Sequence, residues 1–70
     1  MMPLIVSDEG EEVIVRKVGG SPEVRQHLEN LGIVPGDVVT LVSIHDGNVI
    51  LKVKESRIAL NRDMAVKIMI

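Results

Sequence analysis

Apolar and polar residues alternate most regularly over residues 48–54. The apolar positions of this segment are Val49, Leu51 and Val53. This period of two predicts a strand with one buried face, although Ile50 interrupts its polar face. Asp46-Gly47, just before the segment, favours a tight hairpin turn, because both central residues of such a turn take positive φ. The turn would pair this strand with a second predicted strand over residues 38–45.

A helical spacing begins after Ser21-Pro22-Glu23. These residues favour a helix start, because a serine can cap the first turn, proline fits it and a carboxylate faces the positive end of the helix dipole. Apolar residues then recur at spacings of four and three, at Val24, Leu28 and Leu31. Such a stripe is typical of a helix that buries one face. Gly32 follows directly and is the expected left-handed residue that ends the helix.

Further apolar runs predict three more strands, over residues 12–18, 57–60 and 66–70. Asn61 can cap a single helical turn before the last of them. Five or six short antiparallel strands are too few for a two-sheet sandwich, but they can curl into a small, partly open barrel. The sequence therefore predicts one mainly β domain over residues 1–70, compatible with an SH3-like barrel that carries one inserted α-helix.

Composition narrows the functions open to this domain. Hydrophobic residues make up 46% of the chain, yet it has no Phe, Tyr, Trp or Cys. Base-stacking platforms, aromatic cages, disulfides and thiolate metal sites are therefore excluded. Eight basic residues against ten acidic ones give a net charge of −2, which lacks the basic footprint that a nucleic acid requires. No apolar run approaches the ~18 residues of a membrane span, so we expect a cytoplasmic protein.

Candidate metal ligands are few and scattered. His27 follows Glu23 by four residues on the predicted helix, and His45 lies beside Asp46 in the predicted hairpin. Each pair could face one ion, but a structural site needs about four ligands, so both pairs are better interpreted as solvated surface groups. The acidic run over residues 8–12 lacks the spacing of a calcium loop. We predict no metal site, no cofactor and no enzymatic activity, because no set of residues meets the requirements of an active site.

The mean hydropathy of +0.29 leaves apolar residues without an obvious place in so thin a core. If the regular face of residues 48–54 points inward, Ile50 points outward, and Val66 and Met69 are left toward the surface. One interpretation buries these side chains under the helix or the N-terminal segment. The other makes them a docking surface or a self-association surface of a homo-oligomer.

Two motifs in the chain resemble the signature of the FeoA family, the ferrous iron transport protein A family. They read Arg25-x-x-Leu28-x-x-Leu31-Gly32-Ile33-Val34-Pro35-Gly36-x-x-Val39 and Ile58-Ala59-Leu60-x-Arg62-x-x-Ala65-x-x-Ile68. The resemblance implies an SH3-like barrel and a role in bacterial ferrous iron uptake, as an accessory that docks on the cytoplasmic part of the FeoB-type transporter. It also leaves an alternative, because similar domains occur in metal-dependent repressors: a metal-responsive regulatory domain that binds a divalent transition metal.

Arg25 is the candidate polar anchor for a partner. It begins the first motif, yet it neither caps the predicted helix nor belongs to its apolar stripe. Interface hot spots favour arginine and buried apolar anchors over scattered charges. We therefore predict a composite partner-binding site, with Arg25 as its polar anchor and Ile50 and Met69 as apolar contacts if they prove adjacent.

Overall fold

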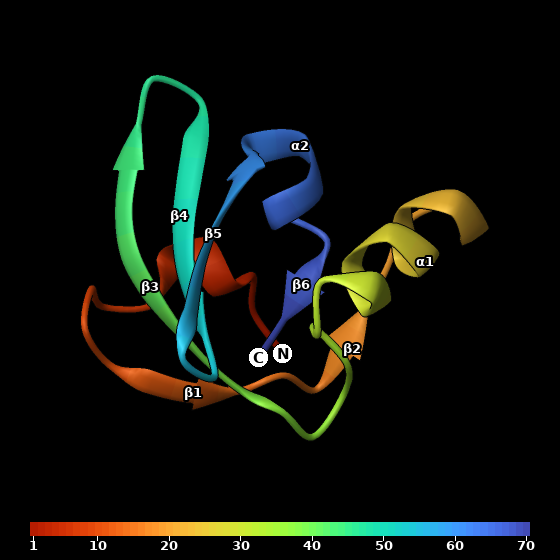
Figure 1. Cartoon of the computed structure of the whole chain (residues 1–70), viewed down its shortest axis with the longest axis horizontal. Coiled ribbons are helices and arrows are strands. Elements are labelled where there is room, and N and C mark those ends of the chain that lie inside the picture. Colours follow the sequence, from red (N-terminus) through yellow and green to blue (C-terminus); the bar gives the residue numbers. More distant parts are fainter.

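The computed structural model describes residues 1–70 and divides the strands between two antiparallel sheets. The elements in chain order are the 3-10 helix η1 (Leu4–Val6), β1 (Glu12–Ile14), β2 (Lys17–Val18), α1 (Pro22–Asn30), β3 (Val38–His45), β4 (Asn48–Val53), β5 (Ser56–Asn61), α2 (Arg62–Ala65) and β6 (Ile68–Met69). The first sheet has the order β1-β3-β4-β5, and β2 pairs with β6 in the second. Figure 1 shows α1 outside the four-stranded sheet and the two chain ends side by side. The mainly β fold with one inserted helix is thus confirmed.

The β3–β4 hairpin forms as the alternation predicts. Asp46 and Gly47 have φ of 45° and 84°, the positive values that the tight turn requires. The inward-facing residues of β4 are at most 3% exposed; they are Val49, Leu51 and Val53. The register shifts between Leu41 and Ser43, which marks a β-bulge in β3. An extra residue of this kind bends the strand and increases its twist, as a sheet that curls into a barrel needs.

Helix α1 begins and ends at the expected residues. The Ser21 hydroxyl accepts a hydrogen bond from the Val24 N–H at 3.2 Å. Gly32 has a φ of 91°, and the Ile33 N–H donates to the Leu28 carbonyl at 2.9 Å. That bond closes the helix end in the way a left-handed residue permits. The short helix α2 is capped likewise, because the side chain of Asn61 accepts from the Met64 N–H at 2.8 Å.

Two predicted strands are shorter than expected. Residues 12–18 form two strands, because the Val15 N–H donates to the Asp37 carbonyl at 2.9 Å whereas the Arg16 N–H donates to the Met69 carbonyl at 2.8 Å. The chain therefore crosses from one sheet to the other between these residues. The last strand begins at Ile68 rather than Val66, because Val66 still ends α2 by donating its N–H to the Arg62 carbonyl at 3.0 Å.

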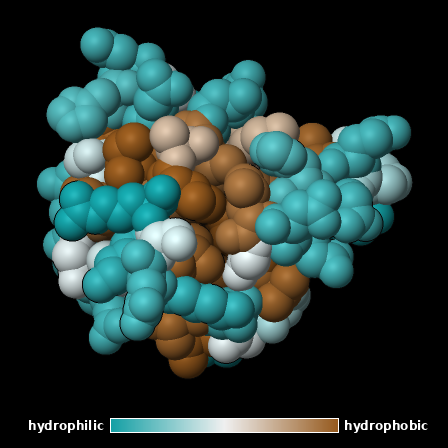
Figure 2. All heavy atoms as spheres, viewed as in Figure 1, coloured by the Kyte–Doolittle hydropathy of each residue, from teal (hydrophilic) through white to brown (hydrophobic).

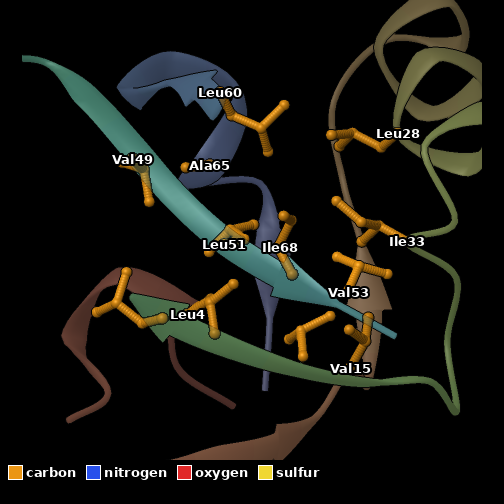
Figure 3. Packing of buried hydrophobic residues seen from close by; sticks show 12 residues of the cluster. Leu4, Val15, Leu28, Ile33, Val49, Leu51, Val53, Leu60, Ala65 and Ile68 are labelled. Carbon is orange, nitrogen blue, oxygen red and sulfur yellow. The ribbon is translucent and has the colours of Figure 1, made fainter. Parts of the chain in front are cut away.

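The core contains only apolar side chains. Twelve residues are buried, and none of them is polar: Leu4, Val15, Leu28, Ile33, Val39, Leu41, Val49, Leu51, Val53, Leu60, Ala65 and Ile68. Figure 3 shows them converging from the four-stranded sheet, from β6 and from α1. Leu4 of the N-terminal segment is fully buried among them. The N-terminal segment thus covers part of the core.

Candidate partner-docking surfaces

Arg25 lies at a groove between α1 and β2. The groove has a volume of about 260 Å³ and is lined by Arg16, Lys17, Val18, Arg25, Glu29, Ile33, Val34 and Pro35. Three cations and one carboxylate make this lining basic, although the chain as a whole carries −2. Arg25 is exposed, and its guanidinium takes part in none of the four side-chain hydrogen bonds of the protein. Its charge is therefore free to meet a partner.

Packing of Leu28 against the core determines where Arg25 lies. The Leu28 side chain is fully buried and fixes one face of α1 against the core, as Figure 3 shows. Arg25 lies three residues earlier, so it sits beside Leu28 on the helix surface, at the edge of the buried face. The helix places the guanidinium near β2 through packing of its apolar stripe, without any bond to the guanidinium itself.

The two apolar residues of the predicted composite site lie in different sheets. Met69 is half-buried in β6, directly opposite Lys17 of β2, and Lys17 lines the groove of Arg25. Ile50 is half-buried in β4, between Ser43 of β3 and Ala59 of β5. Opposite residues in an antiparallel pair project to the same face. Met69 is therefore next to a residue of the Arg25 groove, whereas Ile50 belongs to the face of the four-stranded sheet.

The most exposed apolar side chains are not those that the sequence pattern singled out. They are Met1, Met2, Val6, Ile14, Val38 and Ile44. Val66, like Ile50 and Met69, is only half-buried. Ile14 and Val38 are directly opposite each other in β1 and β3, and they are 52% and 46% exposed. The pair lies at the end of the β1–β3 pairing, just before the break between β1 and β2, and a run of β-branched residues gave no signal for that break.

A second feature of the surface is visible in Figure 2. Hydrophobic residues gather at the centre of the face in view, between the four-stranded sheet and α1, and hydrophilic residues surround them. Half-buried side chains that pack against the core from α1 and the residue after it, from β5 and from α2 include Val24, Leu31, Ile58 and Met64. The barrel is thus incompletely covered where α1 stands away from the sheet.

The two histidines lie on the surface. His27 is exposed on α1, and His45 is exposed at the end of β3. No group of three or more His, Cys, Asp or Glu side chains is arranged to hold a metal ion. None of the helices reaches the length and apolar character needed to cross a membrane.

Comparison with known proteins identifies the family. The model of the FeoA domain matches residues 2–70. The chain belongs to the FeoA family. A protein of Methanocaldococcus jannaschii, provisionally named Fe(2+) transport protein A, is 40% identical over 70 residues, which are 100% of this chain and 85% of that protein. This membership confirms the resemblance that the two sequence motifs indicated.

Solved structures show that this FeoA domain also shares its fold with known proteins. A crystal structure described as iron uptake regulatory protein (FeoA) is 27% identical with a TM-score of 0.84, over 96% of this chain and 89% of that one. The zinc complex of Stenotrophomonas maltophilia FeoA, described as a prokaryotic SH3 domain protein, is 21% identical with a TM-score of 0.83, over 99% and 88% of the two chains. The latter likeness shows the fold alone, and it confirms the SH3-like barrel.

Proposed function

We propose that this FeoA domain is a non-enzymatic accessory of ferrous iron uptake that binds the cytoplasmic part of a FeoB-type transporter. Family membership supports the pathway, as does the reference to Fe(2+) transport in the name of the 40% identical relative. The observation that carries the docking role is the basic groove beside Arg25. A transporter segment that binds there has to offer acidic side chains to Arg16, Lys17 and Arg25.

The energetics of such a contact favour arginine as the anchor. A guanidinium keeps its charge, is weakly hydrated and binds carboxylates through two parallel hydrogen bonds. The apolar part of the contact is Met69, which lies opposite Lys17 in the β2–β6 pair. Ile50 is proposed as a separate apolar contact on the outer side of the four-stranded sheet, where Ser43 and Ala59 leave it flanked by small side chains.

Titration calorimetry with the soluble cytoplasmic domain of the cognate transporter tests this function, with and without GTP. We expect a dissociation constant of about 1–10 µM, weakened as salt screens the basic groove. Lys17→Glu should weaken binding by about tenfold, because it reverses one charge of the groove. Lys52→Glu is the matched control, since Lys52 is exposed on β4 and does not line that groove. Absence of binding with and without GTP would contradict the proposal.

A second titration distinguishes transporter binding from the alternative function, that of a metal-responsive regulatory domain. Fe²⁺, Mn²⁺ and Zn²⁺ are each added to the protein, and the heat of binding is measured. The scattered positions of His27 and His45 lead us to expect only weak binding. A site with a dissociation constant of about 1 µM or lower would instead favour a metal-responsive regulatory domain.

A further inference from the structure

Strand β2 has one unpaired edge. It pairs only with β6. The Gly19 N–H donates to the Lys67 carbonyl at 2.8 Å, so it points toward the β6 side. Backbone groups alternate in direction along a strand. The Val18 N–H and C=O groups therefore point away from β6, and neither makes a hydrogen bond within the chain.

The groove of Arg25 lies along this edge. The Gly36 N–H donates to the Val15 carbonyl at 2.8 Å, and this bond joins the segment before β3 to the segment before β2. Both segments then line the groove, the first through Ile33 and the second through Val18. Because β6 occupies the other edge of β2, it leaves the groove side of Val18 open to a partner.

The two free backbone groups of Val18 favour one kind of ligand. A carboxylate can accept a hydrogen bond from the Val18 N–H, but it has no hydrogen to donate to the Val18 carbonyl. One residue of an extended chain does both, as in the hydrogen-bonded pairs of an antiparallel sheet. The edge therefore fits a peptide segment that adds to β2 as a strand.

The side chains around the edge indicate the composition of that segment. Val18 packs against the core and lies opposite the buried Ile68, so its side chain is on the inner face of β2. A residue paired with Val18 shares this face and has to be apolar. Its two neighbours point to the other face, which Lys17 shares. Three cations and one carboxylate line the groove, so these neighbours should be acidic.

We propose that the partner segment binds the groove as an antiparallel strand on the free edge of β2. An apolar residue of the segment makes two backbone hydrogen bonds with Val18, and acidic residues on either side of it meet the cations of the groove. The inference rests on the proposed function, because it specifies how the transporter segment binds. Since β2 offers a single free residue pair, both the backbone bonds and the charges are needed for affinity.

A synthetic peptide tests this binding mode without the transporter. The probe is a pentapeptide of alternating glutamate and valine, beginning with glutamate and capped at both ends. Titrated into isotope-labelled protein, it should shift the Val18 amide resonance with a dissociation constant of about 1 mM or lower. No binding of the probe would overturn the proposal.

N-methylation of the probe shows whether its backbone is used. A copy methylated at both valines loses the N–H groups of the edge that faces Val18, and it should bind about tenfold more weakly. A copy methylated at the second and third glutamates is the matched control, because the valine edge stays intact. It should bind within about threefold of the parent peptide. Equal binding by the two methylated copies would overturn the proposal.

Val18→Pro removes the same hydrogen bond from the protein side. Proline is tolerated in an edge strand where its missing N–H has no partner in the sheet. The variant should bind the transporter domain about tenfold more weakly, whereas Val18→Ala keeps the N–H and should stay within about threefold of wild type. Circular dichroism checks that both variants fold. A folded Val18→Pro that binds normally would overturn the proposal, and the methylated peptides decide the question if this variant fails to fold.

Hydrogen exchange separates this inference from the proposed function. The Val18 amide should exchange at least about tenfold more slowly when the transporter domain is bound. Ala59 is the control, because the Arg62 N–H donates to the Gly47 carbonyl, and alternation then directs the Ala59 N–H to the free edge of β5. Its exchange should not change. Transporter binding without protection of Val18 would overturn the inference alone, whereas binding of the peptide but not of the transporter would overturn the proposed function.

Two other occupants of the groove are tested in the same way. Inorganic phosphate should leave the Val18 amide resonance in place, because the groove is assigned to a strand rather than to a free anion. Concentrating the protein alone should also leave it in place. A phosphate shift equal to that of the peptide would indicate an anion site, and a shift with protein concentration would indicate a second copy of the chain. Either result would overturn the proposal.

Discussion

Leu28 and Arg25 lie three residues apart on α1, and the helix gives them opposite surroundings. The Leu28 side chain is fully buried in the core, whereas Arg25 is exposed at the basic groove. Both residues belong to the same sequence motif of the FeoA family. The contrast teaches that one motif can contain residues required for folding and residues available for binding. Stability and partner affinity should therefore respond to different substitutions within a single helix.

The largest loss of stability is expected when the buried residue Leu28 is truncated. Leu28→Ala should lower the free energy of unfolding by about 2–5 kcal/mol, because it removes a packed side chain and leaves a cavity. A chain of 70 residues has only about 4–10 kcal/mol of stability in total. Urea unfolding followed by far-ultraviolet circular dichroism measures the change, since the chain has no Trp or Tyr for fluorescence.

Leu31→Ala provides the comparison for Leu28→Ala. Leu31 lies on the same stripe but is only half-buried, so less apolar surface returns to water when it is truncated. We expect it to cost clearly less stability than Leu28→Ala. Equal losses for the two variants would show that burial in the core does not distinguish them.

The fold was predictable wherever local chemistry agreed with tertiary packing. The hairpin at Asp46-Gly47 and the helix between Ser21 and Gly32 carry their own start, turn and end signals. The single strand expected over residues 12–18 was wrong because the break depends on which carbonyl accepts each N–H. Val15 bonds toward β3 and Arg16 toward β6. Those partners are distant in sequence, so no local pattern could reveal the crossing.

The surfaces were harder to predict than the fold. The exposure of Arg25 followed from its position outside the apolar stripe. Its basic neighbours in the groove are distant from the helix motif, because Lys17 lies in β2 and Arg16 directly precedes that strand. The sequence did carry a sign of the exposed position of Ile14, because Glu12 and Arg16 lie two residues away from it and so share its face of an extended chain. The pairing of Ile14 with Val38 places both on the outer face.

An intermediate effect is expected where α1 meets the core at its C-terminal end. Gly32 has a φ of 91°, and a Cβ atom there would lie 3.5 Å from Val53, an ordinary contact. Gly32→Ala should therefore cost about 1–2 kcal/mol through backbone strain rather than collision. Urea unfolding measures this loss.

Gly19→Ala is the matched control for backbone strain. Gly19 does not have positive φ, and its added Cβ would lie 3.7 Å from the Lys67 carbonyl oxygen. Alanine there should leave stability unchanged or raise it by up to about 1 kcal/mol, because it restricts the unfolded chain. If both alanine variants lost the same stability, strain at Gly32 would not be the cause.

The smallest effect on stability is expected on the exposed side of α1. Arg25→Ala should change the free energy of unfolding by no more than about 0.5 kcal/mol, because no hydrogen bond within the chain depends on the guanidinium. Its binding to the transporter domain should nevertheless weaken by about 1–2 kcal/mol or more, as loss of an interface arginine does. Arg57→Ala removes an exposed arginine of β5 outside the groove and should leave both quantities unchanged. If Arg25→Ala bound the transporter domain normally, or lost as much stability as Leu28→Ala, the two sides of α1 would not have separate roles in partner binding and in folding.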